Sequence, residues 1–128
     1  MSPPLALIVE DEQMLAEIFS TALRMAGFTT ESILDGRAAV QRLAEIEPVL
    51  VLLDLHLPGV PGPDILRHIR ADERLAQTRV IIVTADASKA ESLRDLADAI
   101  LLKPLGVIQL RDLAARFRPA DKANPSDS

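Results

Sequence analysis

A chain of 128 residues is long enough to bury the core of one domain without disulfides or metals as staples. Its formal net charge of -5 and its lack of tryptophan and tyrosine argue against direct nucleic-acid binding, because such binders neutralise phosphates with lysine and arginine and stack bases on aromatic rings. The sequence has no cysteine, no basic region at its start and no apolar run of membrane-spanning length, so we expect a cytoplasmic protein without disulfides, signal peptide or membrane contact.

Apolar runs alternate with amphipathic segments in the first part of the chain. Residues 5–9 are fully apolar and predict a buried strand, and residues 13–26 predict a helix that Gly27 ends as a C-terminal cap. Residues 28–33 are more polar and predict an edge strand, followed by a second helix over residues 37–45. The apolar face expected on the first helix comprises Met14, Leu15, Ile18, Phe19, Ala22, Leu23 and Ala26.

The central stretch is an apolar run over residues 49–53 that leads directly into Asp54. Its length and the turn residues that follow predict a strand buried on both faces. Asp54 alone has two interpretations, a strand-terminating or capping residue and a functional carboxylate. After a loop rich in proline and glycine, Gly62 is a candidate N-cap and Pro63 suits the first turn of a third helix. The buried side of that helix is expected to comprise Ile65, Leu66 and Ile69.

The second half of the chain repeats the alternation. Residues 80–83 and 99–102 are fully apolar and predict two more buried strands, separated by a short helix over residues 87–96. An amphipathic helix follows over residues 107–117. The polar tail, residues 119–128, contains proline and no aromatic residue, and we expect it to be disordered.

Five strands alternating with five helices predict one α/β domain over residues 1–118. Such a chain forms a parallel sheet with helices on both faces, joined by right-handed crossovers. The doubly wound (βα)5 flavodoxin-like sandwich with sheet order 2-1-3-4-5 fits best, because it places the polar second strand at an edge.

Polar residues follow four of the five predicted strands. In an open α/β sheet, ligands bind beyond the carboxyl ends of the strands, where the strand order reverses, here between strands one and three. Polar residues at the ends of four strands, all directed to one crevice, are harder to explain as caps than a single such residue is. We therefore interpret the group as a functional site. Its members are Glu10, Asp11, Asp54, Thr84 and Lys103.

Three neighbouring carboxylates repel one another, by about 4 kcal/mol per pair at ~4 Å and an effective dielectric constant of ~20. They must bind a proton or a cation, and the available oxygen ligands select a hard ion such as Mg2+. A carboxylate oxygen can also attack phosphorus and form an acyl phosphate. We therefore expect Asp54 to accept a phosphoryl group, with Lys103 neutralising its oxygens and Thr84 donating a hydrogen bond.

From residue 5 to residue 117 the chain resembles the receiver domain of two-component response regulators, in particular the single-domain, chemotaxis-regulator-like type. The residues that carry the resemblance are Glu10 and Asp11, Asp54 in LLDLHLPG, Gly62, Thr84 with Ala85, and Lys103 with Pro104. The resemblance implies that Asp54 is the phosphoacceptor and that Mg2+ is bound by the three carboxylates and the main-chain carbonyl of His56. It also implies that Thr84, Ala85 and Lys103 bind or respond to the phosphoryl group, and that the Lys103-Pro104 peptide bond is cis.

The same resemblance implies a role in signalling rather than catalysis. The phosphoryl donor would be a histidine kinase or a histidine phosphotransfer protein, and output would proceed by contact with an unknown downstream protein. The chain would not be an enzyme, although it would assist its own phosphorylation and dephosphorylation. We expect a monomer or weak dimer.

The sequence departs from the receiver pattern at two places. Ile100 occupies a position where receivers usually carry an aromatic ring that turns inward with the threonine, and an isoleucine cannot repeat that rotation; its alternative role is ordinary packing on the last strand. The stretch between Thr84 and Lys103 is also shorter than usual by about one helical turn. We therefore expect phosphorylation to be read out differently, through the loops near Asp54.

Two loop residues and two other classes of function remain open. By the resemblance, His56 and Asp86 could tune hydrolysis of the acyl phosphate, whereas His56 could equally be a solvated loop residue. Ile100 and the short fourth helix also suit an interaction module that works without phosphorylation. A phosphohydrolase is disfavoured, because no second aspartate follows Asp54 by two residues to act as general acid.

Overall fold

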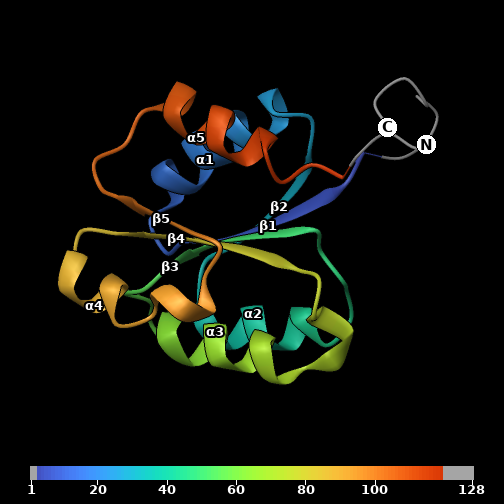
Figure 1. The fold of residues 1–128 in the computed structure, drawn as a ribbon, viewed down its shortest axis with the longest axis vertical. Coiled ribbons are helices and arrows are strands. Elements are labelled where there is room, and N and C mark those ends of the chain that lie inside the picture. Colours follow the sequence, from blue (N-terminus) through green and yellow to red (C-terminus); the bar gives the residue numbers. More distant parts are fainter. Residues whose placement is uncertain (1–2, 120–128) are drawn as a thin grey trace.

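Five strands and five α-helices alternate along residues 3–119, the part of the chain that the computed structural model describes (Figure 1). The strands are β1 (Leu5–Val9), β2 (Thr29–Ile33), β3 (Leu50–Asp54), β4 (Arg79–Thr84) and β5 (Ala99–Leu102). The helices are α1 (Gln13–Met25), α2 (Gly36–Leu43), α3 (Gly62–Ala71), α4 (Ala87–Glu91) and α5 (Val107–Ala115), with single 3-10 turns η1 (Glu73–Leu75) and η2 (Arg94–Leu96). Residues 120–128 of the tail expected to be disordered lie outside this described range.

The strands form one parallel sheet in the order β2-β1-β3-β4-β5, which confirms the predicted topology. Helices α1 and α5 cover one face of the sheet, and α2 and α3 cover the other (Figure 1). In the strand register Val9 lies beside Leu53, and Thr84 beside Leu102. The carboxyl ends of the strands therefore meet along one edge.

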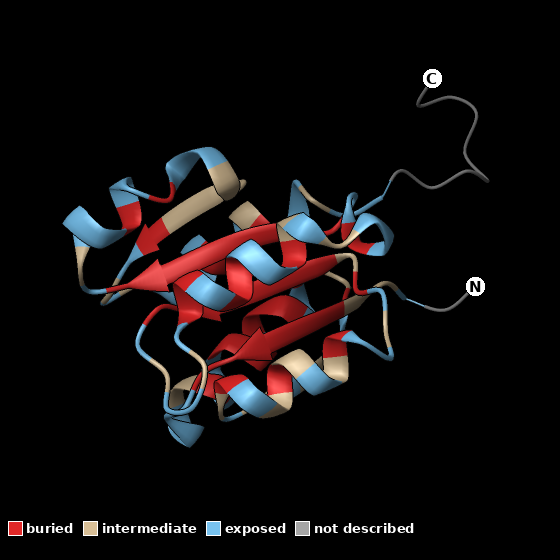
Figure 2. Ribbon diagram, turned by 90° about the horizontal axis from the view of Figure 1, so that it is seen from below, coloured by how far each residue is buried: buried red, intermediate tan, exposed pale blue. Residues whose placement is uncertain are grey.

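Strand β3 is buried along its whole length, as the apolar run predicts, and the central strands are coloured as buried in Figure 2. Successive side chains point to opposite faces, so Leu50 and Leu52 pack with the α1 and α5 layer, whereas Val51 and Leu53 pack with the α2 and α3 layer. Edge strand β2 is only partly buried, as expected. The apolar residues thus form two separate clusters, one on each face of the sheet.

Helix α1 ends as predicted, but the apolar face that it buries is narrower than the predicted one. Gly27 follows the helix with a φ of 100°, a left-handed conformation that glycine adopts without strain. The prediction was wrong for Met14 and Ile18, which are 69% and 38% exposed. Met14 lies in the first turn of the helix, and Ile18 borders a surface groove instead of the sheet.

The N-cap of α3 is Pro61, so the expectation that Gly62 caps this helix was wrong. Gly62 is the first helical residue, and its backbone packs closely against the end of β3. A Cβ atom at Gly62 would lie 2.4 Å from the carbonyl oxygen of Asp54 and 2.5 Å from the Cα of Leu55. Glycine is needed there because no side chain fits between the helix and the strand.

The helix predicted over residues 87–96 is broken. Helix α4 ends at Glu91, and residues 94–96 form the separate turn η2. The Ser92 hydroxyl donates to the Lys89 carbonyl, and the Leu93 amide donates to the Ala90 carbonyl, which tightens the chain and ends the α-helix. Leu93 is consequently drawn into the core, where it is 3% exposed.

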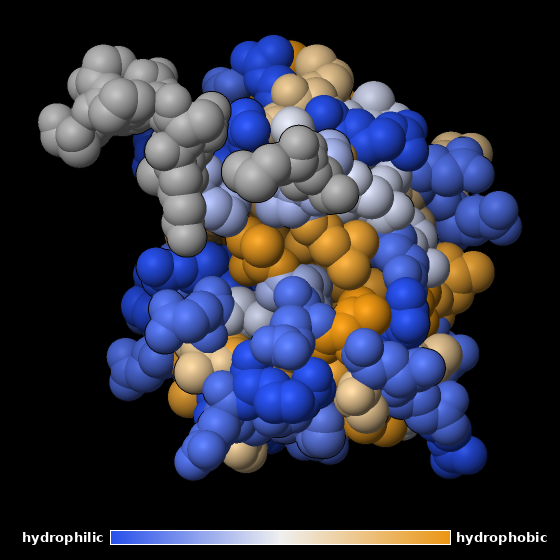
Figure 3. Space-filling view, turned by 90° about the vertical axis from the view of Figure 1, so that its right-hand side faces the viewer, coloured by the Kyte–Doolittle hydropathy of each residue, from blue (hydrophilic) through white to orange (hydrophobic). Residues whose placement is uncertain are grey.

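The opposite edge of the sheet, where the strands begin, carries mixed side chains. Figure 3 shows hydrophobic groups between hydrophilic ones on this side of the molecule. A groove of about 350 Å3 there is bordered by Val49, Phe117 and Pro119 together with Arg79 and Arg116. Among residues 3–119, none of the helices combines the length and hydropathy that a membrane span requires.

Candidate functional site

Three carboxylates meet at the carboxyl ends of β1 and β3. Glu10 and Asp11 follow β1, Asp54 is the last residue of β3, and one oxygen from each lies within 4.8 Å of the other two. Glu10 and Asp54 are 2% and 5% exposed, whereas Asp11 is exposed. The sequence prediction that these three side chains converge is confirmed.

Lys103 reaches this acidic cluster from the end of β5. Its Nζ lies 2.9 Å from Glu10 Oε1 and 3.5 Å from Asp54 Oδ2, so one ammonium group bridges two carboxylates. Burial opposes the charge of Lys103, but the hydrogen bond to Glu10 and the field of Asp54 outweigh it and raise the pKa of Lys103. Lys103 is therefore charged when it meets Asp54.

Glu10 is an unusually buried acid. Burial raises the pKa of its carboxyl group, while the hydrogen bonds from Lys103 and from the Glu12 amide act in the opposite direction. The Glu12 amide donates to Glu10 Oε2 at 3.2 Å, which leaves Oε1 for Lys103. Desolvation of the buried carboxylate outweighs these favourable contacts, and a bound cation would relieve that cost.

The loop after Asp54 is positioned by backbone contacts. The His56 amide donates to Asp54 Oδ1 at 3.2 Å, and the Gly62 amide donates to the Leu55 carbonyl at 3.2 Å. Farther along the loop, Val60 packs against Gly36, the first residue of α2, where a Cβ would lie 1.9 Å from the carbonyl oxygen of Val60. The side chain of His56 is exposed, which agrees with a solvated loop histidine; its role in tuning hydrolysis stays a prediction.

Thr84 ends β4, and its side chain is fully buried. Its Oγ1 accepts a hydrogen bond from the Asp86 amide at 3.1 Å. The Asp86 carboxylate in turn accepts from the Lys89 amide at 3.0 Å and so caps α4. Sequence reasoning missed this capping role, although an aspartate one residue before a helix is its usual signal. Ala85, the residue after Thr84, is exposed.

The two remaining predicted positions lie on and after β5. Ile100 is partly buried and packs against the cluster that contains Ala90 and Leu93, which agrees with an ordinary packing role. The Lys103-Pro104 peptide bond is cis, as the resemblance implies.

An apolar groove of about 390 Å3 adjoins Lys103, and sequence reasoning did not find it. Its walls come from α1 and from the chain after β5, with Ile18, Pro104 and Leu105 among the lining residues. The available signal was an excess of apolar residues on α1 relative to what a helix on one face of a sheet can bury.

The donor set fits a hard divalent cation. The cluster offers carboxylate oxygens only, with no cysteine anywhere in the sequence and no histidine among the three clustered residues. Such oxygen ligands suit Mg2+, which binds through one or two carboxylates, keeps several waters and is completed by a phosphate group. The three carboxylates could therefore hold such a cation.

The sequence also matches known proteins. The family described as "Response regulator receiver domain" matches residues 6–115. The DNA-binding response regulator MtrA of Mycobacterium leprae (strain TN) is 36% identical over 121 residues, which is 94% of this chain and 52% of that relative. This chain thus spans about half the length of the curated relatives it matches.

Solved structures share the architecture. The chemotaxis response regulator CheY4 of Vibrio cholerae superposes with a TM-score of 0.83 over 91% of this chain and 99% of that one, at 22% identity, which supports the fold alone. The receiver domain of sensor histidine kinase PA1611 from Pseudomonas aeruginosa PAO1 gives a TM-score of 0.81 at 26% identity, over 91% and 98% of the two chains. That structure is described as having a magnesium ion coordinated in its active site cleft.

Proposed function

We propose, because this chain belongs to the response regulator receiver domain family, that Asp54 accepts a phosphoryl group in a two-component phosphorelay. The observation that carries the proposal is the contact of Lys103 with both Glu10 and Asp54 inside a cluster of three carboxylates. A capping role for Asp54 explains neither the partly buried Lys103 nor the two further acids. A phosphoacceptor site requires both.

In this proposal the carboxylates of Glu10, Asp11 and Asp54 and the main-chain carbonyl of His56 hold Mg2+. The three carboxylates have the oxygen chemistry that this ion prefers, and the similar PA1611 receiver domain is described with magnesium in its cleft. When bound, the ion supplies positive charge that neutralises phosphoryl oxygens. It also offsets the repulsion among the acids.

The reaction transfers phosphorus from nitrogen to oxygen. A carboxylate oxygen of Asp54 attacks the phosphorus of a phosphohistidine, the phosphorus–nitrogen bond breaks, and the nitrogen of the donor takes back the electron pair. The products are an aspartyl phosphate on this chain and a histidine on the donor. Lys103 then pairs with a phosphoryl oxygen instead of a carboxylate, and the Thr84 hydroxyl donates to another.

The partners follow from this chemistry. The donor is a histidine kinase or a histidine phosphotransfer protein, and the receiver passes its signal by contact with a downstream protein, as a monomer or weak dimer. The chain is not an enzyme in this proposal, because Asp54 is itself modified and no external substrate turns over. The proposal places the chain in the cytoplasm and assigns no nucleic-acid contact to residues 3–119.

Intact-mass measurement after incubation with acetyl phosphate and MgCl2 tests the proposal. The wild-type chain should gain the mass of one phosphoryl group, and tandem mass spectrometry should locate it on Asp54. Asp54→Asn should gain none, whereas Asp64→Asn, an exposed acid on α3, should behave as wild type. Modification at another residue, or equal modification after removal of divalent ions, would contradict the proposal.

A second candidate is an interaction module that works without phosphorylation. The packed Ile100 favours it, because this residue lacks the ring through which receivers usually couple phosphorylation to their surface. Equal binding of the downstream protein by wild type and Asp54→Ala, with and without a phosphodonor, would support this candidate. The complete acidic cluster makes the phosphoacceptor the better supported function.

A further inference from the structure

The loop after β3, residues 55–61, leaves and re-enters the fold beside Asp54; we call it the β3–α3 loop. At its start Leu55 is buried, and the His56 amide donates to Asp54 Oδ1 at 3.2 Å. At its end the Gly62 amide donates to the Leu55 carbonyl at 3.2 Å. Both ends of the loop are therefore fixed at the candidate phosphoacceptor.

The middle of the β3–α3 loop is held by the start of α2. The Gly36 amide donates to the Pro58 carbonyl at 3.0 Å. Gly36 is the first residue of α2, and the first amides of a helix have no partner within the helix. The Asp35 carboxylate accepts from another of these amides, that of Ala38, at 2.8 Å. The helix therefore uses one free amide for its own cap and another for the loop, and its dipole favours a carbonyl oxygen at that place.

The contact between α2 and the loop requires glycine at position 36 because of space. A Cβ at Gly36 would overlap the carbonyl oxygen of Val60 and lie 2.8 Å from its carbonyl carbon, whereas the φ of Gly36 is not positive. Helix α2 is anchored by Ala39 and Leu43, which are both fully buried, while residues 58–59 of the loop are exposed. A side chain at position 36 would therefore displace the loop and not the helix.

Such a displacement reaches His56 because the β3–α3 loop has few adjustable backbone angles. Its ends are fixed, and the rings of Pro58 and Pro61 fix their φ angles. The residue before each proline is restricted as well. Most of the remaining freedom lies in His56 and Gly59. A shift in the middle of the loop must therefore rotate the backbone at His56.

We propose that Gly36 is a positioning residue for Mg2+, because the start of α2 sets the place of the His56 carbonyl through the β3–α3 loop. The proposal rests on the proposed function, in which that carbonyl is a ligand of the ion. Gly36 lies outside the acidic cluster and acts only through the loop. Groups that orient the ligands of a metal change its affinity by about 10–100-fold, although they do not contact it.

Mg2+ binding by the full chain, measured by isothermal titration calorimetry, tests the proposal. Gly36→Ala should weaken binding about tenfold. Gly106→Ala is the matched control, because it makes the same change at the start of α5, where no atom lies within 4 Å of the new Cβ. This control should bind as wild type. Equal affinity of Gly36→Ala and wild type would overturn the proposal.

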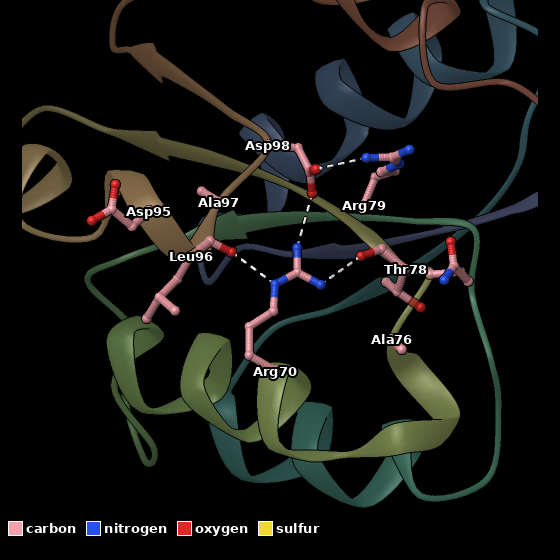
Figure 4. Close-up of a pocket in the computed structure, with 9 residues that line it drawn as sticks. Arg70, Ala76, Thr78, Arg79, Asp95, Leu96, Ala97 and Asp98 are labelled. Atoms are coloured by element: carbon pink, nitrogen blue, oxygen red, sulfur yellow. Dashed lines mark hydrogen bonds and ion pairs between the residues drawn. The ribbon is translucent and has the colours of Figure 1, made fainter.

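Arg70→Ala separates positioning from a general loss of stability. Figure 4 shows that Arg70 donates to the carbonyls of Leu96 and Thr78, and both of these distances are 2.8 Å. These contacts lie where β4 and β5 begin, at the edge of the sheet opposite to the acidic cluster. Arg70→Ala should therefore weaken the fold but keep the Mg2+ affinity of wild type. A loss of affinity equal to that of Gly36→Ala would overturn the proposal.

NMR spectra recorded with a chelator test the position of the loop without any metal. The His56 amide donates to Asp54 Oδ1, so its chemical shift reports the backbone at this residue. Gly36→Ala should change this shift, whereas Gly106→Ala should leave it as in wild type. An unchanged His56 amide in Gly36→Ala would overturn the proposal.

A milder pair of variants applies even where Gly36→Ala fails to fold. Asp35→Ala and Asp35→Asn both remove one negative charge, but only asparagine keeps an oxygen for the Ala38 amide. Losing the cap should let the start of α2 move, so Asp35→Ala should bind Mg2+ about fivefold more weakly than Asp35→Asn. Equal affinities of these two variants would overturn the proposal.

The titrations also separate this proposal from the proposed function. Absence of Mg2+ binding by wild type would contradict the proposed function and, with it, the positioning role of Gly36. Binding of Mg2+ by wild type, together with phosphorylation of Asp54 and no difference from Gly36→Ala, would overturn the positioning role alone.

Discussion

Replacing Asp11 by asparagine should stabilise the protein in the absence of divalent ions. Asp11 lies within 4.8 Å of both Glu10 and Asp54, whereas Lys103 pairs with these two acids. At that separation each repulsive pair costs about 0.9 kcal/mol in water and about 3.5 kcal/mol at an effective dielectric constant of ~20. Because Asp11 is exposed, the lower value applies, and relief of two pairs should add about 2 kcal/mol to the free energy of unfolding.

Urea unfolding measures this effect, first with a chelator and then with MgCl2. Wild type should gain about 1.4 kcal/mol at a Mg2+ concentration ten times its dissociation constant, because the ion binds only the folded state. Asp11→Asn should gain less, so its advantage should shrink or disappear in Mg2+. Glu17→Gln, at an exposed position on α1, removes the same charge and should change neither value. A less stable Asp11→Asn in chelator, or an equal gain from Mg2+, would refute the electrostatic reasoning.

Three further substitutions test the fold around the site by urea unfolding. Gly62→Ala should lower the free energy of unfolding by about 1–3 kcal/mol, because its Cβ would meet the backbone at the end of β3. Gly106→Ala is the control and should change stability little, because no atom lies within 4 Å of the new Cβ. Arg70→Ala should cost about 2–4 kcal/mol by leaving two backbone carbonyls without a donor, while Arg67→Ala, which breaks an exposed ion pair, should cost less than about 1 kcal/mol. Burial raises the pKa of Glu10, so the folded state binds a proton there more tightly than the unfolded state does. Without Mg2+, the free energy of unfolding of wild type should therefore fall as the pH rises from the usual pKa of 4.5 through the raised pKa. Glu10→Gln, which cannot titrate at this position, should lack this loss.

The sequence predicted the strands better than the helices. Strands β3 and β4 were found because both of their faces are buried, which leaves an unbroken apolar run. The extent of α4 was not found, because residues 87–96 have helical spacing throughout, whereas the break depends on the hydrogen bonds that the Ser92 hydroxyl and the Leu93 amide form. The exposed Met14 was wrongly predicted to be buried, because an apolar residue at helical spacing need not face the sheet.

The site was predictable where it depends on topology alone. Parallel strands end at one edge, so the order of the strands places Glu10, Asp54 and Lys103 together. The closer pairing of Lys103 with Glu10 than with Asp54 could not be foreseen, because it depends on side-chain conformations. The hydrogen bond by which Asp86 caps α4 could not be foreseen either, because it depends on the conformation of the loop after β4.

The sheet separates two apolar clusters that have no residue in common. Ala16, Phe19 and Leu110 belong to the layer of α1 and α5, whereas Ala90 and Leu93 belong to the layer of α2, α3 and α4. A side chain that changes volume in one layer therefore meets no side chain of the other layer directly, because the sheet lies between them. Over evolutionary time, one side of the molecule can acquire a new binding specificity while the opposite side keeps the shape that its existing partner requires.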